Sequence, residues 1–404
     1  RLVPFPQGLR ALNHPDYRRF YIGQVVSQVG SWMQSVGQAW LVLQLTGSPL
    51  KLGLIGTLQF TPVLLFSVFT GALADRLPKR RVLLATQIGI ASLALTLGLL
   101  VRFGHVEYWH VCVLATILGC VNTLDMPTRQ SFVAELVSKE DIVNAVALNS
   151  AAFNTARIVG PVAAGLLIAR FGVAIAFLLN ALSFALVIAA LIRMRNEGRP
   201  QAPRGTTMLA DVGEGLRYAF QVRSIRLLLL LLFVVSITVF NFSVYVPLLA
   251  RTVLHVDAAG FGFLMAAVGV GAVTGALTLG NLRRAQLALP TVFASGFVAC
   301  GGLVVMSTVT RFAVAMPMLF VIGVSSIMLV ASCNTALQLT APDNLRGRVM
   351  SLYTLIFGGS FPIGSFLVGW ISERRGVSTA YLAAGMCGLA GLAIITVWWR
   401  SDPE

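Results

Sequence analysis

Residues 71–81 read GALADRLPKRR, in which one acid and four bases interrupt two long apolar runs at 50–74 and 82–101. Each run has the length of about 20 residues that an α-helix needs to cross the hydrocarbon core of a bilayer. The stretch therefore predicts a short charged loop between two membrane-spanning helices.

Apolar runs separated by short charged segments continue through the rest of the chain. Of the 404 residues, 57% are apolar and only 11% are charged, whereas soluble domains carry roughly 25% charged residues. Ten more apolar runs are long enough to span a membrane: 20–45, 108–126, 145–169, 173–192, 227–250, 259–280, 289–309, 312–337, 349–371 and 379–399. The sequence excludes a soluble globular protein and predicts an all-α integral membrane protein with twelve transmembrane helices. The first run is too long and too rich in glutamine for a signal peptide, so we expect it to stay in the membrane.

The basic residues indicate how the chain crosses the membrane. The net charge is +15, but nearly all of the 30 Lys and Arg fall between apolar runs or at their ends, so a nucleic-acid partner is not expected. Lys and Arg beside helix ends tend to remain cytoplasmic. With both termini inside, the inner segments hold 22 of these residues, the outer loops hold seven, and Arg157 lies within a run. We therefore predict that both termini are cytoplasmic.

The chain divides into two halves. Residues 193–226 hold seven Arg and two Pro, and form the only long polar linker between the runs. We predict a six-helix bundle at 1–192, a cytoplasmic linker at 193–226 that can hold an amphipathic helix, and a second bundle at 227–404. Shifting the chain by 204 residues aligns seven glycine pairs, among them Gly71 with Gly275. The halves are therefore predicted to be pseudo-symmetric repeats about an axis along the membrane normal.

The loop at 71–81 resembles the signature loop of the major facilitator superfamily of transporters, with Pro78 where a second glycine is usual. A carboxylate at a helix end can face the positive N-terminus of another helix. The resemblance implies that Asp75 faces the eleventh span and that the loop arginines pair with an acid at the inner end of the fourth span. It predicts a conformational latch made of Gly71, Asp75, Arg76, Arg80 and Asp125.

A second motif lies in the fifth run. The segment 157–165 resembles the Gly-Pro motif of antiporters in this superfamily, with Ala164 where a further glycine is expected. Its motif residues are Arg157, Gly160, Pro161 and Gly165. Proline removes one backbone hydrogen bond and bends a helix, while small residues allow close helix contact. Segments 125–131 and 154–157 resemble the enterobactin-exporter-like branch, which implies a drug or siderophore exporter in a prokaryotic inner membrane.

The first run carries a polar stripe. Its members are spaced four, three, four and three residues apart, and fall on one helix face: Gln24, Gln28, Ser31, Ser35 and Gln38. Such a face is too polar for lipid, so it faces either a substrate cavity or other helices. In the fifth run Asn154 and Arg157 share one face, and Arg157 should lie deep in the membrane, as a substrate site or as a structural hydrogen-bond hub. From the second half we add as candidate cavity residues Asn241, Tyr245, Asn334, Gln338, Tyr353 and Phe357.

Chemistry other than transport has little support in the sequence. No catalytic constellation or metal-ligand spacing occurs, and the five Cys show no CxxC pair, so we predict no enzyme, no cofactor and no metal. The predicted energy source is the proton gradient, although no Asp or Glu occupies the middle of a run. Asp75 or Asp125 could couple protons, and a uniporter is the alternative.

The function predicted here is export of small amphipathic molecules by alternating access. A lipid or lysolipid flippase on the same scaffold and a nutrient importer are the alternatives. The expected partners are the small-molecule substrate and the lipid bilayer, with the protein as a monomer.

Overall fold

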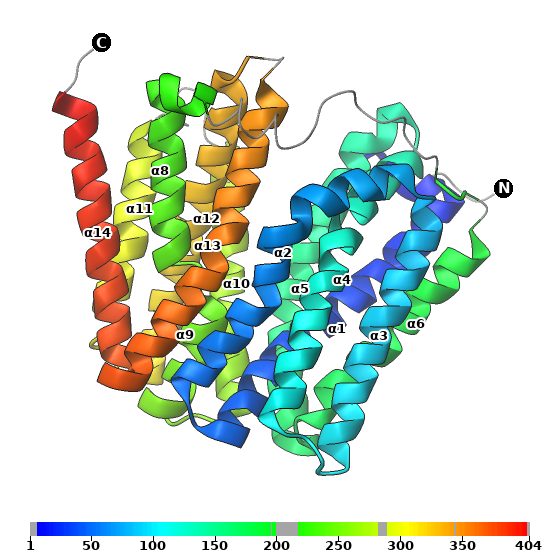
Figure 1. Ribbon diagram of the computed structural model, residues 1–404, viewed down its shortest axis with the longest axis horizontal. Helices are drawn as coiled ribbons and strands as arrows, with labels where there is room; N and C mark the ends of the chain where they lie inside the picture. The colour runs from blue at the N-terminus through cyan, green and yellow to red at the C-terminus, as the bar shows by residue number, and fades with distance from the viewer. Residues whose placement is uncertain (1–5, 195, 199–216, 282–288, 343–344, 402–404) are drawn as a thin grey trace.

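The computed structural model describes residues 6–194, 196–198, 217–281, 289–342 and 345–401, apart from the side chains of 67–69, 71, 72, 74, 75 and 281. The described residues form helices and no strands (Figure 1). The predicted all-α membrane fold is confirmed. The first half of the chain contains η1 (Gln7–Asn13), α1 (Pro15–Thr46), α2 (Pro49–Arg76), α3 (Lys79–Arg102), α4 (Tyr108–Glu135), η2 (Lys139–Asp141), α5 (Ile142–Phe171) and α6 (Ala174–Arg193). The second half contains α8 (Arg223–Thr238), α9 (Phe242–Leu248), the π-helical η3 (Leu249–Val253), α10 (Ala258–Asn281), α11 (Leu289–Met306), α12 (Phe312–Thr340), α13 (Arg346–Arg375) and α14 (Val377–Ser401).

Local signals explain where the first helices begin and end. Pro15 and Pro49 occupy the first turns of α1 and α2, where a missing N–H costs nothing. Gly47 ends α1 with a φ of 63°, in the left-handed region that glycine tolerates. Ser48 then caps α2, accepting a hydrogen bond from the Lys51 N–H at 3.2 Å. A two-residue turn thus reverses the chain between two long helices.

Eleven helical segments in the described part of the chain are long and apolar enough to cross a membrane, with α8, α9 and η3 counting as one segment. The helix α1 is not among them, although its 32 residues are also long enough. Its polar stripe lowers its mean hydropathy. Other faces of the helix pack against α5 and α6. The twelfth span, α1, therefore stays a prediction.

Glycines of the predicted repeat occupy equivalent contacts in the two halves. Gly119 of α4 faces the Gln59 carbonyl of α2, and Gly323 of α12 faces the Val268 carbonyl of α10. In each case an added Cβ would lie within 2.4 Å of the carbonyl oxygen, so only glycine allows this approach. The same helix crossing thus recurs after 204 residues, which supports the internal repeat, while the exact domain boundaries stay a prediction.

The two halves meet at one end of the molecule. We call the end where α1 begins and α14 finishes the terminal face, and the opposite end the distal face. In Figure 1, α2 and α13 lean in the same direction and lie next to each other toward the distal face. There Gly53 packs against Gly369, and the Thr57 hydroxyl donates to the Pro362 carbonyl at 2.9 Å.

A second interface joins α5 and α10. An added Cβ on Gly165 would lie 3.1 Å from the Cα of Gly262. Gly165 and Gly369 are themselves partners under the 204-residue shift, so the two interfaces between the halves are related by the repeat.

Candidate functional site

The polar stripe of α1 contacts neighbouring helices at its two ends and is more exposed in its middle. At its terminal end the Gln24 Oε1 accepts a hydrogen bond from Arg129 of α4 at 3.0 Å, and at its distal end the Gln38 Nε2 donates to Gln59 of α2 at 3.0 Å. Between them Gln28 is half-buried and Ser31 and Ser35 are exposed. The ends of the stripe therefore bind neighbouring helices, while its middle remains open to a ligand.

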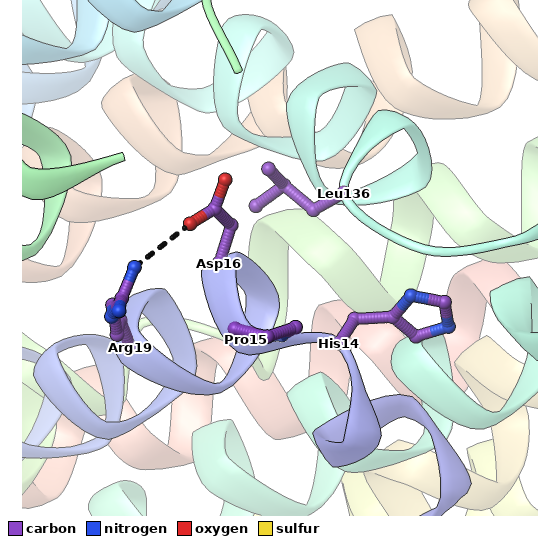
Figure 2. A pocket seen from close by; sticks show the side chains of 5 residues that line it. All are labelled: His14, Pro15, Asp16, Arg19 and Leu136. Atoms are coloured by element: carbon purple, nitrogen blue, oxygen red, sulfur yellow. Dashed lines mark hydrogen bonds and ion pairs between the residues drawn. The ribbon is translucent and has the colours of Figure 1, made fainter. Parts of the chain in front are cut away.

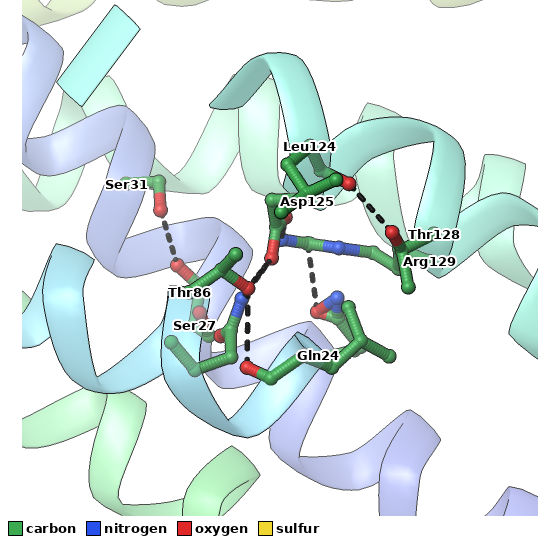
Figure 3. Close-up of polar contacts among 10 residues, drawn as sticks. Gln24, Ser27, Ser31, Thr86, Leu124, Asp125, Thr128 and Arg129 are labelled. Atoms are coloured by element: carbon green, nitrogen blue, oxygen red, sulfur yellow. Dashed lines mark hydrogen bonds and ion pairs between the residues drawn. The ribbon is translucent and has the colours of Figure 1, made fainter. Parts of the chain in front are cut away.

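Asp125 forms the centre of a buried network at the terminal end of the stripe (Figure 3). Its carboxylate is fully buried, pairs with Arg129 one turn along α4, and accepts hydrogen bonds from Thr86 at 2.6 Å and Gln87 at 2.8 Å. These donors compensate the cost of burying the charge. Because Arg129 also donates to Gln24, the network joins α1, α3 and α4.

This arrangement differs from the predicted latch. Asp125 pairs with Arg129 and not with a loop arginine, because Arg80 donates instead to the Leu191 and Ile192 carbonyls at the end of α6, at 2.6 and 2.8 Å. Arg76 is exposed. The surroundings of Gly71 and the side chain of Asp75 lie outside what the structure describes. The contact of Asp75 with the eleventh span therefore stays a prediction.

Arg157 lies in the middle of α5, about 21 Å from either end of the helix. On one side of it Gly160 packs against Trp32 of α1, and on the other the Pro161 carbonyl faces Gly262 of α10. At about 100° per residue, Arg157 lies between these two faces and points between α1 and α10, toward the interface of the halves.

Contacts between α1 and α5 fix the depth of Arg157. Tyr17 donates to the Ala145 carbonyl at 3.0 Å and Tyr21 to the Leu148 carbonyl at 3.3 Å, so residues about 128 apart share one level. Arg157 is therefore level with Val29, which is next to Gln28 in the middle of the stripe. Among the described residues, no hydrogen bond or ion pair to its guanidinium group is recorded, and the predicted hub for neighbouring carbonyls is not formed in this conformation. Asn154, on the same side, donates to the Ser150 carbonyl of its own helix at 2.9 Å.

The structure corrects two of the candidates in the second half. Asn241 and Tyr245 are buried and do not line an open surface in this conformation. The Asn241 Oδ1 accepts a hydrogen bond from Ser365 at 3.1 Å where the seventh span breaks between α8 and α9, and the Tyr245 hydroxyl donates to the Thr238 carbonyl at 3.1 Å. Both stabilise the break in the helix.

The remaining candidates lie on or near an aromatic cluster, which comprises Phe60, Phe240, Tyr353, Phe357 and Phe361. Phe357 is 5.1 to 6.2 Å, between ring centres, from Phe240, Phe361 and Tyr353, and Phe361 stacks on Phe60 of α2 at 5.2 Å. The cluster thus reaches α2 beside Gln59, the partner of the stripe. In α12, Gln338 donates to Asn334 at 2.6 Å, one helical turn away.

A separate pocket of about 410 Å³ opens at the terminal face and is lined by His14, Pro15, Asp16, Arg19 and Leu136 (Figure 2). Its charged groups are already paired, Asp16 with Arg19 at 3.2 Å and His14 with Asp141 at 2.9 Å. The Asp16–Arg19 pair lies within α1, and the His14–Asp141 contact joins the start of α1 to the start of α5. Within the described part of the chain, no group of three or more metal-ligating side chains occurs.

Comparisons with known proteins place this geometry in a family. Residues 7–400 match the model of a family of major facilitator transporters described as transmembrane secretion effectors. The chain is 23% identical to the staphyloferrin A transporter of Staphylococcus aureus, covering 94% of both chains, and 27% identical to the multidrug efflux pump Tap of Mycolicibacterium fortuitum, covering 88% of this chain and 89% of the relative. It is 25% identical to the enterobactin exporter EntS of Salmonella choleraesuis, covering 95% and 91%.

Solved structures agree on the fold. A bacterial homologue of the human lysosomal transporter Spinster, in an inward-facing and occupied conformation, superposes with a TM-score of 0.77 at 12% identity and covers 98% of both chains. The predicted resemblance to major facilitator exporters is confirmed. The chain is a multi-pass membrane transporter and belongs to the transmembrane secretion effector family of the major facilitator superfamily.

Proposed function

We propose that this transporter exports small amphipathic molecules, drug-like or siderophore-like, across a bacterial inner membrane by alternating access. The names of its relatives, a siderophore transporter, a multidrug efflux pump and an enterobactin exporter, support this direction and these substrates. The observation that carries the proposal is the position of Arg157, a cation without a recorded partner that points into the interface of two halves.

The contacts between the halves support alternation. The recorded glycine contacts join α2 to α13 and α5 to α10, and they extend from the distal face to the middle of α5, where Gly269 faces the Arg157 carbonyl. Glycine contacts bring backbones close without interlocking side chains, so one half can rock against the other at little cost. Rocking that separates Gly53 from Gly369 would open the distal face and close the terminal face.

The residues at the interface suit an amphipathic substrate. Arg157 offers a fixed positive charge with five N–H donors, and Gln28, Ser31 and Ser35 add neutral hydrogen-bonding groups nearby. The aromatic cluster supplies ring faces for apolar parts of a substrate. A molecule with an acidic or hydroxyl-rich part and a flat apolar part would use both.

Asp125 is the proton carrier that we propose for antiport. Protonation would neutralise the partner of Arg129 and release Arg129 and Gln24 from the network, which loosens the contact of α1 with α4. In proteoliposomes, wild-type export should accelerate with an imposed pH gradient. The Asp125→Asn variant should show the same rate with and without the gradient. Export by the wild type that ignores the gradient would favour a uniporter.

A transport panel tests the proposed function itself. Cells that lack their own exporters, with and without the protein, are loaded with cationic drugs or catecholate siderophores, and the cell-associated compound is followed over time. We expect faster loss of the siderophores from cells that carry the protein, and slower siderophore loss with Arg157→Gln. Loss of cationic drugs should be less sensitive to Arg157→Gln, because the guanidinium group does not attract cations. Net accumulation of any of these compounds would indicate import, and translocation of labelled lipid without solute efflux would indicate a flippase.

A further inference from the structure

Two arginines at the start of α8 meet two tryptophans at the end of α14. The guanidinium carbon of Arg223 lies 4.6 Å from the ring centre of Trp399 and 5.5 Å from that of Trp398, and the guanidinium carbon of Arg226 lies 4.6 Å from Trp398. Arg223 also donates to the carbonyls of Trp398 and Trp399, at 3.3 and 2.7 Å. We call these four residues the Arg–Trp clamp.

The clamp carries positive charge that its surroundings do not balance. No carboxylate among the described residues forms an ion pair with Arg223 or Arg226. The C-terminus of α14 contributes about half a negative charge against the two cations. The Nε atoms of both arginines are buried without an acceptor. The Nη1 of Arg223 and the Nη2 of Arg226 also have no acceptor among the described residues and are not among the buried atoms, so an oxyanion can reach them, although it cannot reach Nε. Such an anion would balance the charge, and a phosphate suits the planar donor groups of guanidinium.

The position of the clamp indicates whether its phosphate would belong to a lipid or to a soluble molecule. It lies at the terminal face where two membrane-spanning helices end, the level at which tryptophan rings settle among lipid headgroups. Exposed apolar side chains continue from it along α14, with Ile394 68% and Val397 66% exposed. Phe220, whose carbonyl accepts from Arg226 at 3.3 Å, is 62% exposed. An occupant with a phosphate and hydrocarbon chains would fit this surface better than a soluble anion.

We propose that the Arg–Trp clamp binds the headgroup phosphate of an anionic phospholipid, with its acyl chains along Ile394 and Val397. Basic sites between transmembrane helices on the cytoplasmic side bind such headgroups. The bound lipid fastens α8 to α14, and so holds the first part of the span that breaks at Asn241. This site is separate from the substrate surface at Arg157, and it exists whether or not the protein exports drugs.

Thermal unfolding of the delipidated full-length protein in detergent tests the site. Phosphatidylglycerol, phosphatidylcholine and soluble glycerol phosphate are titrated separately. We expect stabilisation by phosphatidylglycerol at lower concentrations than by phosphatidylcholine, and none by glycerol phosphate. In the double variant Arg223→Gln/Arg226→Gln the half-maximal phosphatidylglycerol concentration should rise by about fivefold for each arginine. Arg193→Gln removes the same charge from an exposed position at the end of α6 and should leave the titration unchanged.

Three results would overturn the proposal: equal titrations of wild type and double variant, an equal loss in Arg193→Gln, and stabilisation by glycerol phosphate alone. The first would exclude the clamp, the second would indicate general surface charge, and the third would indicate a soluble anion. If the double variant does not fold, Arg226→Gln alone carries the test, because the one hydrogen bond recorded for the Arg226 side chain is to the carbonyl of Phe220, an exposed residue. Arg226→Lys should then fall between wild type and Arg226→Gln, since lysine keeps the charge without the fork.

Discussion

Arg157 is the residue on which substrate handling should depend most. Arg157→Gln should abolish export while the melting temperature of the purified protein stays at the wild-type value, because no described residue is bonded to the guanidinium group. Arg157→Lys should restore part of the activity, since it returns the charge but not the planar fork. Arg170→Gln, an exposed site on the same helix, is the control and should transport normally. A lowered melting temperature together with normal flux in Arg157→Gln would instead assign the residue a structural role.

Arg129 should matter for stability. Arg129→Gln leaves the buried Asp125 carboxylate without its ionic partner, and breaking such a pair costs about 3–5 kcal/mol. Arg76→Gln removes an exposed charge from the same face and should change the free energy of unfolding by about 0.5 kcal/mol or less. Chemical denaturation in detergent compares the two variants. Similar free energies of unfolding for both would mean that the network contributes little.

The sequence predicted which residues form the polar site more reliably than it predicted the contacts that their side chains make. The spacing of the α1 stripe placed Gln24 to Gln38 on one face, but helical periodicity cannot tell which members meet α2 or α4. Asp125 and Arg129 are four residues apart, a spacing that favours a pair within one helix. The resemblance to the family implied a pair between Asp125 and the loop arginines instead. Asn241 and Tyr245 are buried in this conformation by the break between α8 and α9, and no periodic signal in the sequence marks that break.

At the scale of helices, the contact of α5 with α10 depends on the absence of a side chain. A Cβ on Gly262 would lie 2.4 Å from the Pro161 carbonyl oxygen. Gly262→Ala should therefore push the helices apart at a cost of about 1–3 kcal/mol and reduce transport. Gly280→Ala on the same helix meets nothing within 4 Å and should be neutral or slightly stabilising, because alanine favours helices. Unfolding and flux measurements on both variants check this, and a Gly262→Ala variant that matches Gly280→Ala in both would contradict the packing argument.

The sequence predicted that each long helix forms more reliably than it predicted the residues at which the helix begins and ends. The apolar runs predicted each long helix, since about 20 apolar residues in a membrane leave the backbone no other way to satisfy its hydrogen bonds. Helices such as α13 extend beyond their apolar run, from Arg346 to Arg375, because polar residues at the membrane surface continue the same hydrogen-bonded ladder. The kind of contact between helices was indicated by the repeated glycines, but their partners required the structure.

For the whole molecule, the charge distribution makes a prediction about topology. Because the basic residues gather in the termini, the 193–226 linker and alternate loops, single cysteines introduced into that linker should react with a membrane-impermeant reagent only after the membrane is opened. The background should lack the native cysteines, of which Cys120 and Cys387 are exposed. Labelling of the linker from outside intact cells would show that the protein has the opposite orientation in the membrane.

Alternating access requires that the two halves open at one face while they close at the other, and paired distance measurements test this motion most directly. Spin labels at Lys51 and Arg375 report on the distal face, and labels at Val143 and Leu277, which are 79% and 65% exposed, report on the terminal ends of α5 and α10. As pH or substrate shifts the conformation in lipid nanodiscs, we expect one distance to lengthen while the other shortens. Distances that stay fixed, or that lengthen together, would contradict alternating access in this protein.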